Sequence, residues 1–144
     1  MSYPQRIQVQ RPIINPKITG IGYGNPRYTS MLAYKHGVLV TVGSHVRWVD
    51  IENDAVLFDQ QIGCSQIFQL MENSKYILLV NFDGLITLLN RDNLSIEHQF
   101  YAPGKEIRHS CLTDWVYGNC LAVSCELNNQ SDGTILAIYS LKDI

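Results

Sequence analysis

The chain has 144 residues, of which 46% are hydrophobic, 10% aromatic and 17% charged, and its formal net charge is −2. This length favours a single domain, and the apolar fraction excludes a wholly disordered chain. The longest apolar runs, such as Tyr76–Val80, are far too short to cross a bilayer, and the first residues show no apolar stretch typical of a secretory signal. We therefore expect an intracellular protein, in the cytoplasm or nucleus, without membrane insertion.

The charges are distributed unevenly along the chain. Residues 1–49 contain six Lys or Arg and no acidic residue, a formal +6, so the rest holds all 13 acids and five of the 11 basic residues, a formal −8. Such asymmetry is typical of contact with nucleic acid or an acidic partner. The basic residues are spaced singly, however, so an extended arm lying over its own acidic domain is an equal alternative.

The cysteines do not predict a metal site. Cys64, Cys111, Cys120 and Cys125 include no C-x-x-C pair, which is the spacing that places two thiolates on one metal. In a reducing compartment such residues behave as small buried hydrophobes. We interpret all four as structural.

From Tyr28 onward the sequence predicts strands separated by tight turns. The first unit has strands expected at Val38–Val42, His45–Ile51 and Ala55–Phe58, all rich in β-branched or aromatic residues. Trp48 lies within the central strand of this unit, where a large aromatic side chain is expected to pack in the core.

A second unit repeats this order with strands expected at Tyr76–Val80, Leu85–Leu89 and Leu94–Phe100. Asp83-Gly84 between the first two is a strong hairpin signal, because Gly accepts the positive φ that tight turns require. The repeat continues to the end of the chain, and no segment shows the apolar stripe of an amphipathic helix.

A third unit has strands expected at Leu121–Cys125 and Thr134–Leu141, with a longer polar turn between them. Aligning Asp50, Asn90 and Ser140 at the ends of corresponding strands gives spacings of 40 and 50 residues. A period near 40 without helices is typical of propeller blades.

Three segments resemble the ends of WD40-type blades, in which a turn leads to a strand that closes on an aromatic or apolar residue, then Asp, then an aliphatic residue. They are Gly43–Ile51, Asp83–Asn90 and Asp132–Leu141. The likeness is degenerate, since no segment ends in Trp-Asp. It extends over residues 28–144 and implies an all-β fold: a partial β-propeller of about three antiparallel WD40-like blades, at about 28–62, 63–103 and 104–144.

Three blades are fewer than the four to eight that close a propeller ring. We see no polar residues that would cap either end of the array. Three alternatives follow: the chain is a fragment of a larger protein, it self-associates to complete a ring, or a partner protein covers the ends.

Residues 1–27 form the predicted N-terminal arm. Its segment Arg6–Arg11 alternates polar and apolar side chains like a half-exposed strand, and Pro12 ends it because proline cannot donate to a sheet. The resemblance implies that such a strand can complete the last blade; otherwise the arm can join another protein by strand addition. Gly20–Gly24 lacks the flanking strand and helix of a phosphate-binding loop.

No catalytic motif, metal site or cofactor is expected from the histidines, carboxylates or glycines. The resemblance instead implies a non-catalytic scaffold for protein–protein interaction, acting as a subunit of a larger complex. The alternative is a nucleic-acid-associated subunit that uses the basic arm. The candidate binding residues are Arg6, Arg11, Lys17, Tyr23, Arg27 and Trp115.

Overall fold

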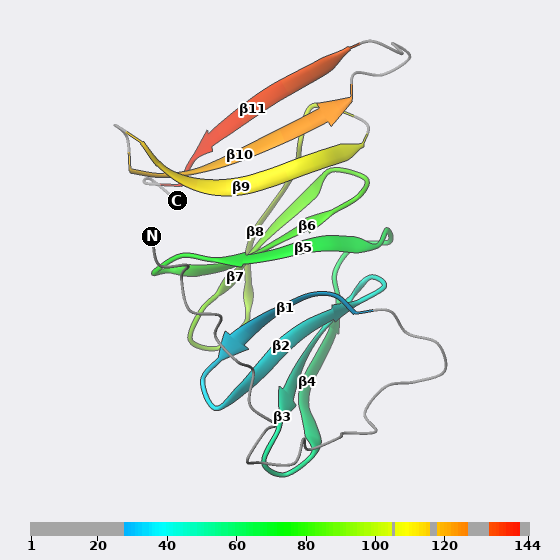
Figure 1. Cartoon of the computed structure of the whole chain (residues 1–144), viewed down its shortest axis with the longest axis vertical. Helices are drawn as coiled ribbons and strands as arrows, with labels where there is room; N and C mark the ends of the chain where they lie inside the picture. The colour runs from blue at the N-terminus through cyan, green and yellow to red at the C-terminus, as the bar shows by residue number, and fades with distance from the viewer. Residues whose placement is uncertain (1–27, 105, 116–117, 127–132, 142–144) are drawn as a thin grey trace, which may run out of the picture.

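The computed structural model describes residues 28–104, 106–115, 118–126 and 133–141, and all regular structure in this part is β (Figure 1). The first sheet has the order β1-β2-β3-β4, the second β5-β6-β7-β8 and the third β11-β10-β9, and every neighbouring pair is antiparallel. The strands are β1 (Tyr28–Tyr34), β2 (Gly37–Val42), β3 (His45–Asp50), β4 (Ala55–Gln61), β5 (Ile67–Glu72), β6 (Tyr76–Asn81), β7 (Leu85–Asn90), β8 (Ile96–Tyr101), β9 (Ile107–Trp115), β10 (Gly118–Glu126) and β11 (Thr134–Ser140).

The three sheets are stacked face to face along the long axis of the molecule, with the second in the middle (Figure 1). Two apolar clusters join them. One contains Leu39 and Val46 from the first sheet and Leu70 and Leu79 from the second, whereas the other contains residues of the second and third sheets. Because the middle sheet packs on both sides, every residue of β6 and every residue of β7 except Asn90 is buried.

Equivalent backbone hydrogen bonds recur forty residues apart where one sheet leads into the next. The N–H of Ile62 donates to the carbonyl of Ser44 (2.7 Å), and that of Ala102 donates to the carbonyl of Gly84 (2.8 Å). Each bond ties the residue that follows an outer strand to the tight turn of the same sheet. The chain therefore enters successive sheets in the same way, as repeated blades require.

The turn after the third strand also repeats. Oδ1 of Asp50 accepts hydrogen bonds from the backbone N–H of Glu52 (3.0 Å) and of Asn53. Oδ1 of Asn90 accepts the same two bonds from Asp92 (2.8 Å) and Asn93. An aspartate and an asparagine thus perform one task, because either side chain offers an acceptor that mimics a backbone turn.

The predicted all-β fold of about three antiparallel blades is confirmed. The sequence did not reveal β1, β5 and β9, the first strands of the three sheets. The pairing of β1 with β2 is interrupted between Tyr28 and Ser30, and that of β5 with β6 between Ile67 and Gln69. The pairing of β9 with β10 is interrupted opposite Ser124 and Cys125. An irregularity of this kind breaks the alternation of apolar and polar residues on which strand prediction depends.

Two predictions about individual side chains are tested by burial. Trp48 packs between blades as expected, against the cluster of the first two sheets and edge-on to Tyr34 at 5.2 Å. The interpretation of the cysteines as buried hydrophobes is right for Cys120 and Cys125 but wrong for the others. Cys64 and Cys111 are exposed, because one lies in a loop and the other points away from the stack.

We predict that Asp50→Ala lowers the urea midpoint of unfolding, whereas Asp50→Asn retains most of the stability, since Asn90 makes the equivalent turn. The Asn53 side-chain amide, which donates to Asp50 Oδ2 at 2.7 Å, holds the pKa of this carboxyl below its usual value. A lowered native pKa stabilises the fold above the unfolded pKa, and this contribution is lost as pH falls through the native value. When the pH falls from 7 to below about 4, the free energy of unfolding should therefore decrease less in Asp50→Asn than in the wild type.

Urea titrations of the wild type and both variants at several pH values test this, with Asn90→Ala as the equivalent change in the second blade. An identical acid dependence in the wild type and in Asp50→Asn would contradict the assignment.

Candidate interaction surface

The third strands of the three sheets place equivalent side chains on the same side of each blade. Counting back from Asp50, Asn90 and Ser140 gives the pairs Val46 and Trp48, Ile86 and Leu88, and Leu136 and Ile138. Val46 and Trp48 face the second sheet, because they belong to the apolar cluster that joins the first two sheets. Ile86 and Leu88 face the third sheet for the same reason. We call this side of each blade its forward side.

The last of these pairs has nothing of the described chain packed on it. Val46, Ile86 and Leu88 are fully buried, whereas Leu136 is 67% exposed and Ile138 is 47% exposed. The alternate residues of β11 behave normally, since Ile135 and Tyr139 point back and pack on the second sheet. The same position in the repeat is thus core in one blade and surface in the last.

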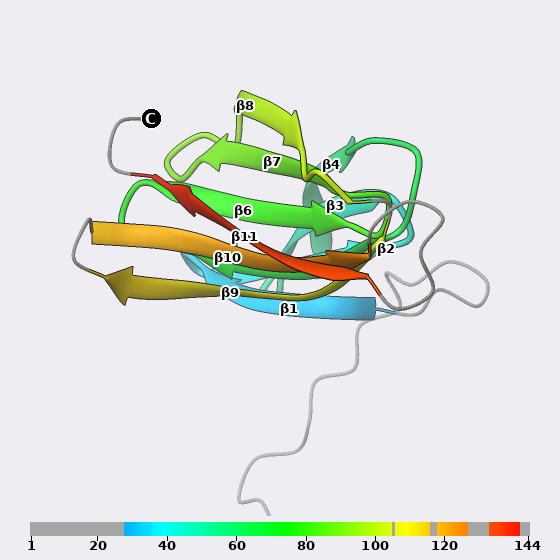
Figure 2. The same cartoon turned by 90° about the horizontal axis from the view of Figure 1, so that it is seen from above.

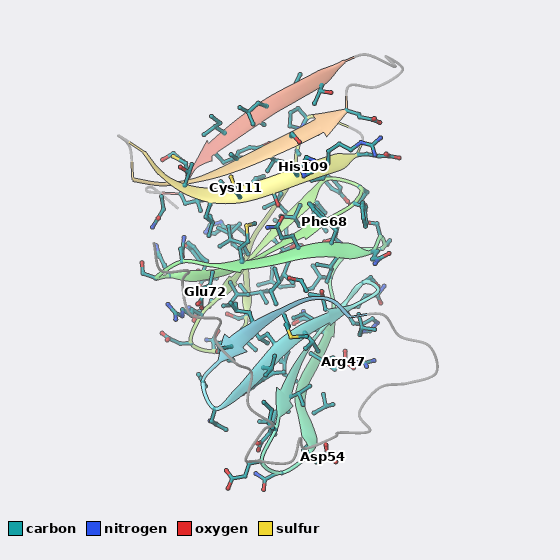
Figure 3. The ribbon with its side chains drawn as sticks, viewed as in Figure 1. Arg47, Asp54, Phe68, Glu72, His109 and Cys111 are labelled. Atoms are coloured by element: carbon teal, nitrogen blue, oxygen red, sulfur yellow. The ribbon has the colours of Figure 1, made fainter. Side chains whose placement is uncertain are left out.

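The forward side of the third sheet extends this apolar surface across three strands. Ala122 and Ser124 of β10 pair with Ile138 and Leu136, and on β9 they pair with Cys111 and His109. Figure 2 looks onto this side with β9, β10 and β11 foremost, and Figure 3 labels the two β9 residues. We call these six residues the open face: His109, Cys111, Ala122, Ser124, Leu136 and Ile138.

The sheet that carries the open face also has an unpaired edge. In the described part of the chain, β11 pairs with β10 alone, whereas its counterpart β7 pairs with β6 and β8. The unpaired edge presents backbone N–H and C=O groups that can receive another strand. An apolar face beside such an edge is a site at which proteins associate.

The opposite end of the stack is built differently. On the rear side of the first sheet, Arg47 lies where the middle blade has the buried Thr87. Its Nε donates to Asp59 Oδ2 at 3.0 Å, and His45 Nδ1 lies 2.8 Å from Asp59 Oδ1 (Figure 3 labels Arg47). This side of the first sheet thus carries polar side chains, and the same row of paired residues includes Met31, which is 64% exposed. The charged residues escaped detection because they alternate with apolar ones.

Of the predicted binding residues, only Trp115 lies among the described residues. Arg6, Arg11, Lys17, Tyr23 and Arg27 lie outside the described residues. Trp115 is the last residue of β9 and pairs with Gly118.

Leu136 and Ile138 were missed as surface residues because an apolar pair in a predicted strand is normally assigned to the core. The repeat held the signal: their equivalents in the other blades require a following blade to bury them.

The described residues show few features of other kinds of site. They contain no group of three or more His, Cys, Asp or Glu side chains that could hold a metal ion. No described helix is long and apolar enough to span a membrane. A small polar hollow of about 230 Å³ lies between the second and third sheets, near Glu72 (labelled in Figure 3), Asn73 and Thr113.

Comparison with known proteins supports the fold and leaves the family open. No protein-family model and no curated protein sequence matches the chain. The computationally designed Ika4 protein is similar in structure, with a TM-score of 0.68 and 12% identity over 90% of this chain and 75% of the designed one. At these identities the likeness concerns the fold.

Two natural WD40-type structures are also similar. The β-propeller domain of Cps50 (Swd1) from Myceliophteria thermophila has a TM-score of 0.59 at 15% identity, over 87% of this chain and 45% of that chain. The WD40 domain of Neurospora crassa Pan2 has a TM-score of 0.58 at 19% identity, over 83% of this chain and 37% of that chain. The chain thus has the fold of a partial β-propeller with WD40-like blades, and it spans less than half of either natural domain.

The exposure of the open face predicts a contrast between equivalent residues. Ile86→Ala should destabilise the chain by about 2–5 kcal/mol, because it leaves a cavity between two sheets. Leu136→Ala, at the equivalent position, should change the free energy of unfolding by no more than about 0.5 kcal/mol in the isolated chain. Urea unfolding of both variants and the wild type checks this. A large loss for Leu136→Ala would mean that the chain itself covers the face.

Proposed function

We propose that the chain is a non-catalytic scaffold for protein–protein interaction and a subunit of a larger complex. The observation that carries this proposal is the pair Leu136 and Ile138, which is exposed where the equivalent residues of the other blades are core. Covering a large aliphatic side chain is worth about 1.5–3 kcal/mol, so this face gives a partner substantial binding energy. The inference from a propeller fold to scaffolding is an analogy, and the open face gives it a physical basis.

The ends of the stack favour a different protein, or further blades, over a ring of identical copies. In such a ring the forward side of one copy meets the rear side of the next. That contact would press Leu136 and Ile138 against a side that carries the exposed Met31 and also Asp59, which is 38% exposed, so the Asp59 carboxylate would lose solvation. A partner with an apolar sheet face avoids this cost.

The unpaired edge of β11 suggests a role for the arm. The alternating segment Arg6–Arg11 has the pattern of a strand, and we propose that it, or a similar segment of a partner, pairs with β11 as a fourth strand. Trp115 ends the β9 strand of the same sheet and remains a proposed contact. The four cysteines of the described chain are all free, which fits the proposed intracellular location.

Photo-crosslinking in the native cells tests the scaffold proposal. A benzophenone amino acid placed at position 136 should form adducts with one or a few defined proteins, while the same group at position 101 should not. Tyr101 is a matched control, because it is 65% exposed and lies on the outer strand β8. Light scattering of the purified chain then separates self-association from a different partner. A monomeric chain with equal crosslinking at both positions would refute the proposal.

The acid-free stretch 1–49 motivates a second candidate, a nucleic-acid-associated subunit. If the arm contacts phosphates, binding to single-stranded RNA or DNA should weaken steeply with salt. Changing Arg6, Arg11, Lys17 and Arg27 to Glu should then abolish it. A fluorescence-anisotropy titration at several salt concentrations measures this, and unchanged binding in the quadruple variant would exclude the arm model. Tyr23→Ala tests base stacking separately, with an expected loss that depends little on salt.

A further inference from the structure

A second surface lies at the boundary between the middle blade and the third. It is a cavity of about 340 Å³ lined by Ser65, Phe82, Asp83 and Glu106. These residues come from the segment before β5, the β6–β7 turn and the segment before β9 (Figure 1). The cavity is therefore assembled by three separate parts of the chain and is distinct from the open face.

Backbone hydrogen bonds fix the walls of this cavity. The N–H of Asp83 donates to Ser65 Oγ (3.2 Å), and that of Phe82 donates to the carbonyl of Gln66 (2.9 Å). The N–H of Ile107 donates to the carbonyl of Phe82 (3.1 Å), which ties the turn to the start of β9. A site held in this way loses little freedom when a ligand binds.

The cavity offers an exposed aromatic ring. Phe82 is 44% exposed although it lies beside a packed blade boundary. Its ring lies 5.2 Å from that of Phe68, tilted by 36°, and Phe68 is anchored against the core between the second and third sheets (labelled in Figure 3). The Phe82 ring is thus supported from within and open to solvent on the remaining side.

Carboxylates accompany this ring. Asp83 and Glu106 are exposed at the cavity, and Asp83 Oδ1 accepts the N–H of Leu85 at 3.2 Å. Arg108 lies 3.5 Å from Glu106 and also donates to Glu126. Among the described residues, the three carboxylates Asp83, Glu106 and Glu126 outnumber the one arginine, so the described part of this edge has an excess of negative charge.

We propose that this cavity binds an arginine side chain of a partner protein. A guanidinium group is planar and weakly hydrated, so it can stack on the Phe82 ring while donating to Asp83 and Glu106. Lysine lacks the planar group, and an apolar side chain would leave both carboxylates unmatched. The inference extends the scaffold proposal to a second surface and is independent of what covers the open face.

Nuclear magnetic resonance of the full chain tests the assignment, with N-acetyl-arginine amide as the probe. Saturable shifts are expected at the backbone amides of Phe82, Asp83 and Glu106. The citrulline analogue, which is neutral and similar in shape, should bind several-fold more weakly. Equal binding of the two probes, or no saturable shift, would overturn the proposal.

Charge-removing variants provide the matched comparison. Asp83→Asn and Glu106→Gln should each weaken the arginine probe roughly twofold to fivefold, as expected for exposed ion pairs. Asp83→Asn keeps an acceptor for the Leu85 N–H, so the turn should remain folded. Asp54→Asn is the control, because Asp54 is exposed in the turn between β3 and β4, at the far end of the stack (Figure 3). An effect of Asp54→Asn as large as that of the cavity variants would contradict the site.

Phe82→Leu tests the ring separately from the charges. It keeps an apolar side chain against Phe68 but removes the π face, so the preference for arginine over citrulline should fall. These experiments use the isolated chain and test the cavity alone. A negative result here would not contradict the open face, and a negative crosslinking result at the open face would not contradict the cavity.

Discussion

Burial of the forward side of each blade by the sheet that follows is the interaction on which this structure depends. In the first two blades the third strand delivers Val46 and Trp48, then Ile86 and Leu88, into apolar clusters with the next sheet. A single blade cannot bury both of its faces, so stability is shared between neighbours as in other repeat proteins. The forward side of a blade is therefore buried only where another sheet follows it. In the described chain no sheet follows the third one, and its forward residues Leu136 and Ile138 are exposed.

The outer faces of the two ends of the array differ in polarity. At the rear of the first sheet, Arg47 and His45 both contact Asp59, the Arg47 side chain is only 13% exposed, and the exposed Met31 lies in the same row of paired residues. At the forward side of the third sheet, aliphatic side chains lie beside the edge of β11 that no other described strand pairs with. Natural proteins usually protect exposed edges with charges or coverings. Because the two ends differ, we expect a partner to bind at the forward side of the third sheet.

Much of this architecture could be predicted from the sequence, because hydrophobic alternation and turn residues are local signals. The hairpin at Asp83-Gly84 and the equivalence of Asp50 with Asn90 both follow from side-chain chemistry that acts within a few residues. The first strands of the sheets were missed, since irregular pairing shifts the alternation. The open face could not be recognised locally, because Leu136 differs from Ile86 only in what lies beyond it.

The cavity at Phe82 illustrates the same limit from the other direction. Ser65, Asp83 and Glu106 are unremarkable polar residues in three separate loops, and no spacing in the sequence relates them. They meet because the N–H of Asp83 donates to Ser65 Oγ and the N–H of Ile107 donates to the carbonyl of Phe82, which brings those loops together at a blade boundary. Blade packing thus does more than stabilise the chain: it makes a site between blades from residues that neither blade could assemble alone.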